Sequence, residues 1–344
     1  MSIQVLRALA ALAVAYGHAA HDGARLSPGF SAPFQGISGA GVDLFFAISG
    51  FVMVISSARL FAAEGGRGVF IRRRLARIVP VYWVATTLFL LTLAMVPGAV
   101  QSAGFSLPDI VKSYLFVPFR RADSGLIQPA YGLGWTLNYE MFFYALFALA
   151  LAWPAGRAVG AVVCVLAGVV GAGLVLPVEA APLVFWSDPI VLEFAFGALV
   201  GLGYLKGLRL PTWAALSLAG AGLAAFFWLN GGGLMPVGWQ RPLLAGLPLA
   251  AVLAGLALMR GGAGGGMRPL ALLGDASYAL YLFHPMAIRV LSALWGRAGL
   301  AVDWGFILAA LGLSAAVSIV IFRLFERPVT QALQASQIKK RQPG

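Results

Sequence analysis

The sequence has few charged residues and a single cysteine. Of its 344 residues, 10% are charged and 60% are hydrophobic. A soluble domain could not bury so much apolar surface, so this balance excludes an ordinary water-soluble protein. The lone Cys164 excludes an internal disulfide and a thiolate metal site, and its place in an apolar run predicts a small buried side chain. We therefore expect an integral membrane protein with no metal site.

Acidic residues are also scarce, and the net charge is +12. Such a charge can indicate nucleic-acid binding, but the chain lacks a basic stripe with interleaved aromatic residues outside its apolar runs. Its Lys and Arg residues lie mostly in short connections, where they act as topology signals and contact lipid headgroups. We expect membrane lipids, and no nucleic acid, among the partners.

Apolar segments long enough to span a bilayer recur along the whole chain, and we count ten of them. The densest basic cluster follows the second segment, so the positive-inside rule places that connection in the cytoplasm. An even number of spans then places both termini there. The expected fold is an all-α plasma (inner) membrane protein with one domain over 1–336 and a short basic tail over 337–344. The segments are 3–20, 40–58, 78–97, 134–153, 157–177, 186–204, 211–229, 243–260, 270–295 and 303–325.

Two stretches allow a second interpretation. The first segment could be a secretory signal peptide, but the many later spans favour a retained signal anchor. The connection over 98–133 is too long for a simple turn. We expect an outside loop there, with a partly buried segment around Tyr114-Leu115-Phe116 that forms a lid or an interfacial helix.

The first segment carries Arg7 and His18 in an otherwise apolar run. Eleven residues are about three helical turns, so both side chains share one face, about 16 Å apart. Ionisable residues in a membrane helix usually face the bundle interior or a water-filled cavity. There are two structural alternatives. The side chain of Arg7 could extend to the inner membrane interface, and His18 could lie at the outer interface without a functional role.

Three more ionisable residues fall in the outer half or middle of the expected bundle: Asp43, Glu140 and His284. Such groups could cooperate in proton transfer around one hydroxyl, with a histidine as the natural base near neutral pH. Structural roles are also open. Asp43 could sit at the interface, Glu140 could form structural hydrogen bonds near Asn138, and His284 could bond a carbonyl freed by Pro285.

An arginine cluster directly precedes the third segment, and it comprises Arg72, Arg73, Arg74 and Arg77. Topology and lipid anchoring explain such a cluster without any further role. Several guanidinium groups within two turns also suit a polyphosphate, so a nucleotide-bearing cytoplasmic donor is the functional alternative.

Taken together, these segments resemble the acyltransferase-3 family of ten-helix membrane acyltransferases. Arg7 and His18 stand at the R-x10-H spacing of that family, and Arg74 and Arg77 fit its R-x-x-R element. The stretch WTLNYEMFFY over 135–144 is similar to the branch that modifies exopolysaccharides. The other matching stretches are VDLFFAISGF over 42–51, LGDASYALYLFHP over 273–285 and FERP over 325–328.

The resemblance implies transfer of an acyl group, commonly acetyl from acetyl-CoA, to a hydroxyl of an extracytoplasmic or lipid-linked sugar. It makes Arg7 and His18 the essential pair and Arg74 and Arg77 the donor-binding element. Acetyl-CoA would be a substrate, and no permanently bound cofactor is expected. Some members carry a fused extracytoplasmic hydrolase-like domain, and we expect the steps assigned to it to be absent. Three further residues in the matching stretches are expected to support the site: Ser49, His284 and Glu326.

The expected mechanism uses His18 as the general base on the sugar hydroxyl. The CoA headgroup would bind at the arginine cluster, and Arg7 would orient the donor or its phosphate. Asp43 or Glu140 could fix the tautomer of His18, and His18 could itself carry the acyl group. The competing classes are a transporter or flippase for a lipid-linked sugar or small solute, which would use the same charges, and a non-catalytic assembly scaffold.

Overall fold

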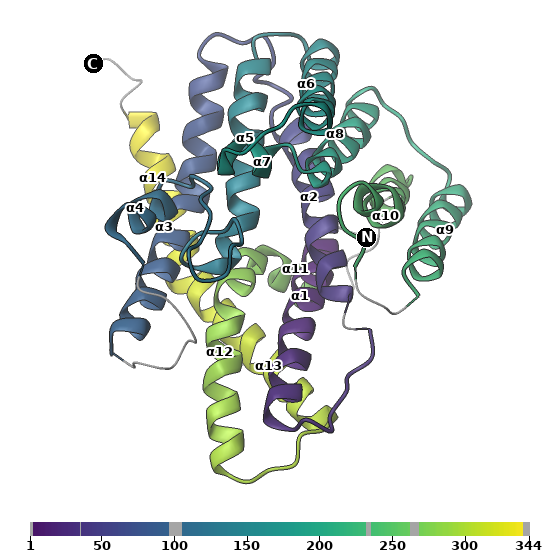
Figure 1. The fold of residues 1–344 in the computed structure, drawn as a ribbon. Helices are drawn as coiled ribbons and strands as arrows, with labels where there is room; N and C mark the ends of the chain where they lie inside the picture. The colour runs from purple at the N-terminus through teal and green to yellow at the C-terminus, as the bar shows by residue number, and fades with distance from the viewer. Residues whose placement is uncertain (1–2, 35, 96–104, 232–234, 262–267, 340–344) are drawn as a thin grey trace. The chain divides into compact units, whose positions relative to one another are not determined.

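Helices make up almost all of the regular structure in a computed structural model of the chain (Figure 1). It describes residues 3–34, 36–95, 105–231, 235–261 and 268–339. Within these ranges there is no β-strand, only single bridges that pair Arg120 with Ile127 and Leu210 with Met259. Contacts between residues divide the chain into two compact units. Unit 1 comprises Met1–Ile55 and Glu193–Leu324, and unit 2 comprises Ser56–Leu192 and Phe325–Gly344.

Unit 1 combines the first two helices with helices from the C-terminal half. They are α1 (Ile3–Leu26), α2 (Ile37–Ser56), α8 (Leu192–Leu205), α9 (Thr212–Asn230), the π-helical turn η3 (Pro242–Gly246), α10 (Leu247–Leu258), α11 (Arg268–Asp275), α12 (Ser277–Arg297) and α13 (Trp304–Ile321). α1 packs against α11, α12 and α13, and α9 packs against α10 (Figure 1). Buried side chains such as Leu44, Phe51 and Leu253 form part of its apolar core.

Unit 2 is built around a long helix that packs against the last helix of the chain. Its elements are α3 (Gly66–Met95), α4 (Leu107–Tyr114), η1 (Gly132–Gly134), α5 (Trp135–Ala150), α6 (Ala155–Val175), α7 (Ala181–Trp186), η2 (Pro189–Val191) and α14 (Arg327–Lys339). α3 packs against α5 and α14, and α5 packs against α6. A second π-helical turn, η4 (Phe322–Glu326), continues α13 into α14.

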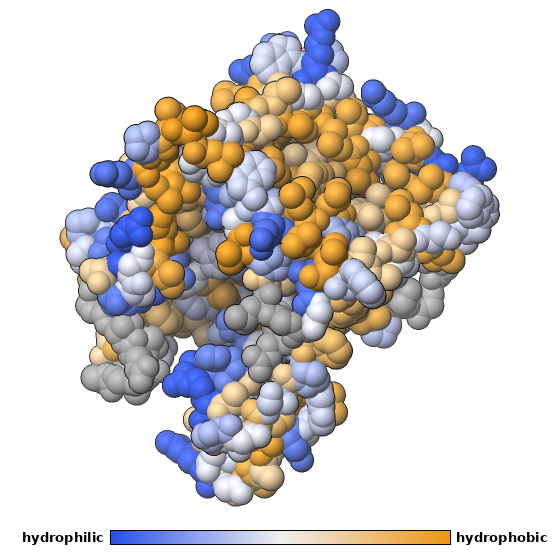
Figure 2. Space-filling view, turned by 45° about the vertical axis from the view of Figure 1, so that its right-hand side comes forward, coloured by the Kyte–Doolittle hydropathy of each residue, from blue (hydrophilic) through white to orange (hydrophobic). Residues whose placement is uncertain are grey.

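Among the described residues, six helices are long and apolar enough to cross a membrane: α1, α2, α3, α6, α9 and the continuous helix Trp304–Ala335. Apolar residues cover much of the face drawn in Figure 2. The expected all-helical fold is therefore confirmed, and the apolar helices supply candidate membrane spans. A helix also lies in each of the other four expected segments, namely α5, α8, α10 and α12. That these four cross the membrane, and that both termini are cytoplasmic, stay predictions.

Several helix boundaries differ from expectation. α1 continues to Leu26 rather than ending at residue 20, and α3 begins at Gly66 rather than at residue 78. A hydropathy window misses both extensions, because their charged and polar residues lower the hydropathy. In α3 these are mostly arginines, which are good helix formers. The arginine cluster consequently lies within a helix. Beyond the last expected span, α14 continues to Lys339, and residues 340–344 of the expected tail lie outside the described residues.

The expectation for Cys164 is wrong, because its side chain is exposed. α6 buries a single face, formed by Val159, Val162, Leu166 and Val170. An apolar residue on the opposite face of a membrane helix therefore stays outside the core. Apolar character alone does not indicate burial in a span.

α2 and α8 approach each other so closely that both need glycine at the contact. A Cβ atom at Gly50 would overlap the carbonyl oxygen of Phe194, and one at Gly197 would overlap the carbonyl oxygen of Ala47. Helices within a membrane associate through such small residues, because lipid tails are as apolar as the side chains they replace. This contact fixes the spacing of the two helices within unit 1.

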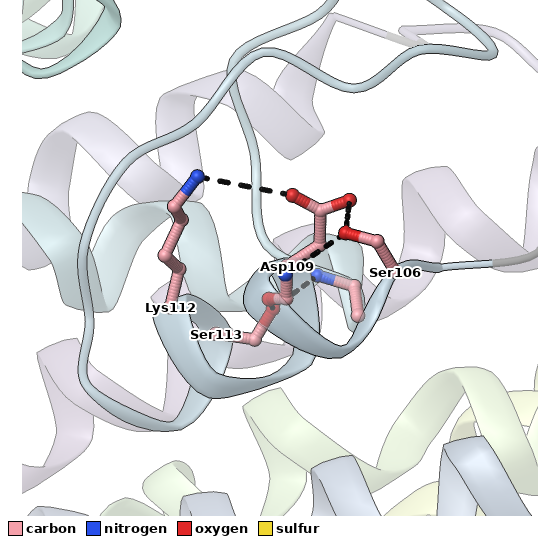
Figure 3. Close-up of polar contacts among 5 residues, drawn as sticks. Ser106, Asp109, Lys112 and Ser113 are labelled. Carbon is pink, nitrogen blue, oxygen red and sulfur yellow. Dashed lines mark hydrogen bonds and ion pairs between the residues drawn. The ribbon is translucent and has the colours of Figure 1, made fainter.

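Side-chain hydrogen bonds hold both ends of α4 (Figure 3). Ser106 caps the first turn by accepting the backbone N–H of Asp109 at 3.3 Å. The buried hydroxyl of Ser113 accepts the backbone N–H of Ala130 at 2.9 Å and donates to the carbonyl of Asp109 at 2.8 Å. Tyr82 of α3 donates to the carbonyl of Ser113 at 3.1 Å. α4 is thereby attached to α3 and to the connection that leads into α5.

Pro80 interrupts the hydrogen bonding of α3. Proline has no N–H, so the carbonyl oxygen of Ala76, one turn earlier, loses its helical partner. The hydroxyl of Thr330 in α14 donates to this oxygen at 3.4 Å. The last helix therefore supplies the hydrogen bond that Pro80 removes from the helix with the arginine cluster.

We expect Gly197→Ala to lower the thermal stability of the protein in detergent, because the added methyl group forces α2 and α8 apart. Overpacking of this kind costs about 1–3 kcal/mol. The control is Gly220→Ala on an exposed part of α9, where nothing lies within 4 Å of the added Cβ. It should melt at or above the wild-type temperature. Equal melting temperatures for the two variants in a thermal-shift measurement would contradict the close packing.

Ser113→Ala should destabilise unit 2, since it leaves the buried N–H of Ala130 without its partner. An orphaned buried donor costs about 1–3 kcal/mol. Hydrogen–deuterium exchange should become faster at Ala130 and in α4, while Ser124→Ala, at an exposed hydroxyl, should leave exchange unchanged. Protection at Ala130 that survives the Ser113 substitution would show that another group holds this connection.

Candidate functional site

The expected site residues fall into two groups, one in each unit. Unit 1 contains Arg7, His18, Asp43, Ser49 and His284. Unit 2 contains Arg72, Arg73, Arg74, Arg77, Glu140 and Glu326. The residues of each group are held by helices of one unit. The geometry within each group is therefore described separately.

The two histidines of unit 1 lie in contact. His18 on α1 and His284 on α12 have ring centroids 4.9 Å apart, with an angle of 66° between the ring planes. His284 is 1% exposed, and its Nδ1 lies 2.9 Å from the carbonyl oxygen of Leu280, one turn earlier on α12. The structure thus brings together two residues that are separated by most of the sequence.

An ion pair lies one turn beyond these histidines. Asp22 follows His18 by four residues on α1, and its buried carboxylate lies 3.3 Å from Nε of Arg289 on α12. Asp22 and Arg289 both act electrostatically on His18. Because α1 extends to Leu26, His18 lies about 12 Å before the end of its helix rather than at it.

Arg7 reaches α11 through a neighbouring side chain. Its guanidinium donates to the Oε1 atom of Gln4 at 3.0 Å, and the amide of Gln4 donates to Asp275 at 2.5 Å. Asp275 ends α11 and belongs to the stretch 273–285. The hydrogen bonds connect two of the matching stretches and fix Arg7 toward the start of α1, eleven residues from His18.

Asp43 is fully buried and paired with an arginine. Both Nε and one terminal nitrogen of Arg241 lie 2.8 Å from the same carboxylate oxygen of Asp43. The buried carboxyl group of Glu193, on α8, also lies against Asp43. Asp43 is 0% exposed, so it is not a surface residue. Ser49 is half-buried on α2, between Asp43 and the glycine contact with α8.

The four arginines of the unit 2 cluster differ in their exposure along α3. Arg72 and Arg73 are exposed, whereas Arg74 and Arg77 are partly buried and one turn apart. Arg74 donates to the hydroxyl of Ser56 at 2.5 Å, and its guanidinium carbon lies 5.5 Å from the centre of the Phe70 ring. Within the described chain, the buried Nε–H of Arg74 has no hydrogen-bond partner.

Glu140 on α5 belongs to the same group. The hydroxyl of Tyr144, one turn later, donates to its carboxylate at 2.6 Å. Tyr144 and Glu140 both act electrostatically on Arg74. The structure therefore places Glu140 among the residues around Arg74. Glu326 is buried at the end of η4, where the chain enters α14.

Sequence inspection does not identify the partners of these groups: Gln4, Asp22, Glu193, Arg241 and Arg289. Two of them leave a local signal, because Gln4 lies three residues from Arg7 and Asp22 lies four residues from His18, each on the same helix face. The other pairs join residues far apart in sequence, and a single sequence gives no local signal for them. Within the described ranges, no group of three or more His, Cys, Asp or Glu residues could hold a metal ion.

Two kinds of chemistry fit these groups. In unit 1, a half-buried imidazole in contact with a second imidazole can accept and return a proton. In unit 2, Arg74 and Arg77 offer guanidinium donors that can bind phosphate oxygens. Glu140 and Tyr144 add an acceptor and a hydroxyl beside them.

Comparisons with known proteins identify relatives that align with most of the chain. The chain is 33% identical over 305 residues to the exopolysaccharide production protein ExoZ of Rhizobium meliloti, covering 88% of this chain and 92% of that protein. It is 27% identical over 297 residues to the acyltransferase MdmB of Streptomyces mycarofaciens, covering 76% and 72% of the two chains. No solved structure matches significantly.

A family profile described as an acyltransferase domain, that of the acyltransferase-3 family, matches residues 2–323. This range contains both histidines, the whole arginine cluster and every residue of unit 1 that bonds to a candidate site residue. The chain is therefore a membrane acyltransferase that belongs to the acyltransferase-3 family.

Proposed function

We propose that the protein is an O-acyltransferase of the plasma (inner) membrane that moves acetyl from cytoplasmic acetyl-CoA to a hydroxyl of an extracytoplasmic or lipid-linked polysaccharide. The observation that carries the proposal is the contact of the half-buried His18 with the buried His284 in a membrane acyltransferase. Placing an ionisable histidine inside a membrane helix bundle costs free energy, so such a residue usually has a function. The relative named for exopolysaccharide production supports the acceptor class.

His18 is the proposed general base. It takes the proton of the acceptor hydroxyl as the hydroxyl oxygen attacks the thioester carbon, and it returns a proton to the departing thiolate. The carboxylate of Asp22 stabilises the imidazolium that forms in between. Arg7, fixed through Gln4 and Asp275, orients the donor from the other end of α1.

The arginine cluster is the proposed binding site for the CoA phosphates. Arg74 and Arg77 bind the phosphates directly, since the Nε–H of Arg74 is buried and lacks an acceptor among the described residues. Arg72 and Arg73 are exposed and attract the donor through their charge. Glu140 balances the charge of Arg74 while no donor is bound.

Asp43 has a supporting part in the proposal. Its carboxylate binds Arg241 with two guanidinium nitrogens, and it thereby holds α2 next to η3. Ser49 and Glu326 support the site from α2 and η4. A transporter would use the same charges without consuming a donor, so the assays below measure transfer of the acetyl group.

His18→Ala should reduce transfer of label from radiolabelled acetyl-CoA to polysaccharide by at least about 10²-fold, the contribution of a positioned general base. The acceptor is polysaccharide isolated from cells that lack the gene. His21→Ala is the matched control, because His21 is an exposed histidine three residues further along α1. Wild-type membranes that transfer no label would overturn the proposed reaction. Full activity of an inserted His18 variant would overturn the assigned base.

Arg74→Lys should raise KM for acetyl-CoA about tenfold or more, because lysine keeps the charge but loses the planar fork of guanidinium donors. Arg67→Lys changes an exposed arginine at the start of the same helix and should leave KM unchanged. KM and kcat are read from initial rates at saturating polysaccharide. Unchanged KM in the Arg74 variant would mean that the donor binds elsewhere.

A further inference from the structure

The ring of His284 has a defined tautomer. A carbonyl oxygen can only accept a hydrogen bond, so the Nδ1 that lies 2.9 Å from the oxygen of Leu280 carries the proton. In the neutral ring, Nε2 then has the free lone pair. This Nε2 is buried and has no hydrogen-bond partner among the described residues. A buried acceptor of this kind lacks one donor.

The ring of His18 is placed to supply that donor. It meets His284 edge to face, with 4.9 Å between the ring centroids. The described part of the chain offers the His18 ring no other hydrogen-bond partner. Catalytic hydrogen bonds are often long without substrate and shorten in the reactive complex. A small rotation of His18 would bring one of its ring nitrogens to Nε2 of His284.

The charged groups nearby do not fill this role. Asp22 lies one turn along α1, and its carboxylate is paired with Arg289 of α12. His21, three residues along α1, also acts electrostatically on His18, but its side chain is exposed. The Tyr281 ring lies 6.3 Å from that of His284, on the same helix. None of these residues contacts the ring of His18 as His284 does.

We propose that His284 is the positioning residue of the base: its Nε2 accepts the N–H of His18, so that the other nitrogen of His18 faces the acceptor hydroxyl. This inference rests on the proposed function. During transfer the hydroxyl proton moves to that free nitrogen of His18, the oxygen–carbon bond forms and the carbon–sulfur bond breaks. The N–H bonded to His284 stays in place and keeps the imidazolium oriented. His284 then acts as a neutral counterpart of the carboxylate that orients a catalytic histidine in hydrolase triads.

A purely structural role makes the opposite prediction. In that case His284 matters only because its Nδ1–H bonds the carbonyl of Leu280 next to Pro285. Asparagine places an amide N–H near the position of Nδ1 and has nothing near Nε2. Glutamine places an amide oxygen or nitrogen near the position of Nε2. The two variants therefore separate the two roles.

We expect His284→Asn to fold and to bind donor like the wild type but to lower kcat about 10²-fold, with KM for acetyl-CoA unchanged. His284→Gln should recover most of the activity, because its side-chain oxygen can accept the N–H of His18. In the His18→Ala background, neither substitution should lower the residual rate further. Each variant is assayed in membranes with radiolabelled acetyl-CoA and the polysaccharide acceptor, and its melting temperature is measured in detergent.

Three outcomes overturn the inference and leave the proposed function intact. They are wild-type activity in His284→Asn, equal activity in the folded Asn and Gln variants, and greater activity in Asn than in Gln. The last would show that the bond to Leu280 is what matters. Failure of the proposed function is distinct, because the wild-type protein itself would then transfer no label or the His18→Ala variant would stay active.

Discussion

Water does not reach the hydrocarbon core of a membrane, so polar groups there must find partners within the protein. Several ionisable residues within the helices of this chain follow that constraint. Asp43 binds Arg241, Asp22 binds Arg289, and Arg7 reaches Asp275 through Gln4. Even the backbone carbonyl released by Pro80 has a hydroxyl beside it. Several buried polar atoms of the described residues nevertheless lack a hydrogen-bond partner. Nε2 of His284 and Nε–H of Arg74 are two of them, and they lie at the two places where we propose that substrate groups bind.

The positions of the helices could be predicted from the sequence, and most of their partners could not. Apolar runs locate the spans, since a helix is the only element that satisfies its own backbone in lipid. The same reasoning does not predict the first turns of α3, because the arginines over 72–77 interrupt the apolar run although they are helical. The pair of Asp43 with Arg241 joins residues 198 positions apart, and no local pattern encodes such a contact.

The candidate site was predictable in its residue types and only partly in its geometry. R-x10-H spacing places Arg7 and His18 on one helix face, which the continuous α1 confirms. The order of motifs identifies the family, which the match over residues 2–323 confirms. The contact between His18 and His284 is different, because it depends on how α1 and α12 pack. Sequence alone offers Asp43 and Glu140 as partners of His18, since a carboxylate is the usual orienting group.

The bond from Thr330 to Ala76 has a consequence for how the protein is made. The ribosome completes α3 long before α14 exists, and 254 residues separate donor and acceptor. Until the last helix emerges, the carbonyl below Pro80 has to use water or a transient neighbour. Each unit is likewise assembled from an early and a late part of the chain. The arginine helix can therefore reach its final hydrogen bonding only near the end of translation, which limits how early the nascent chain could bind a donor.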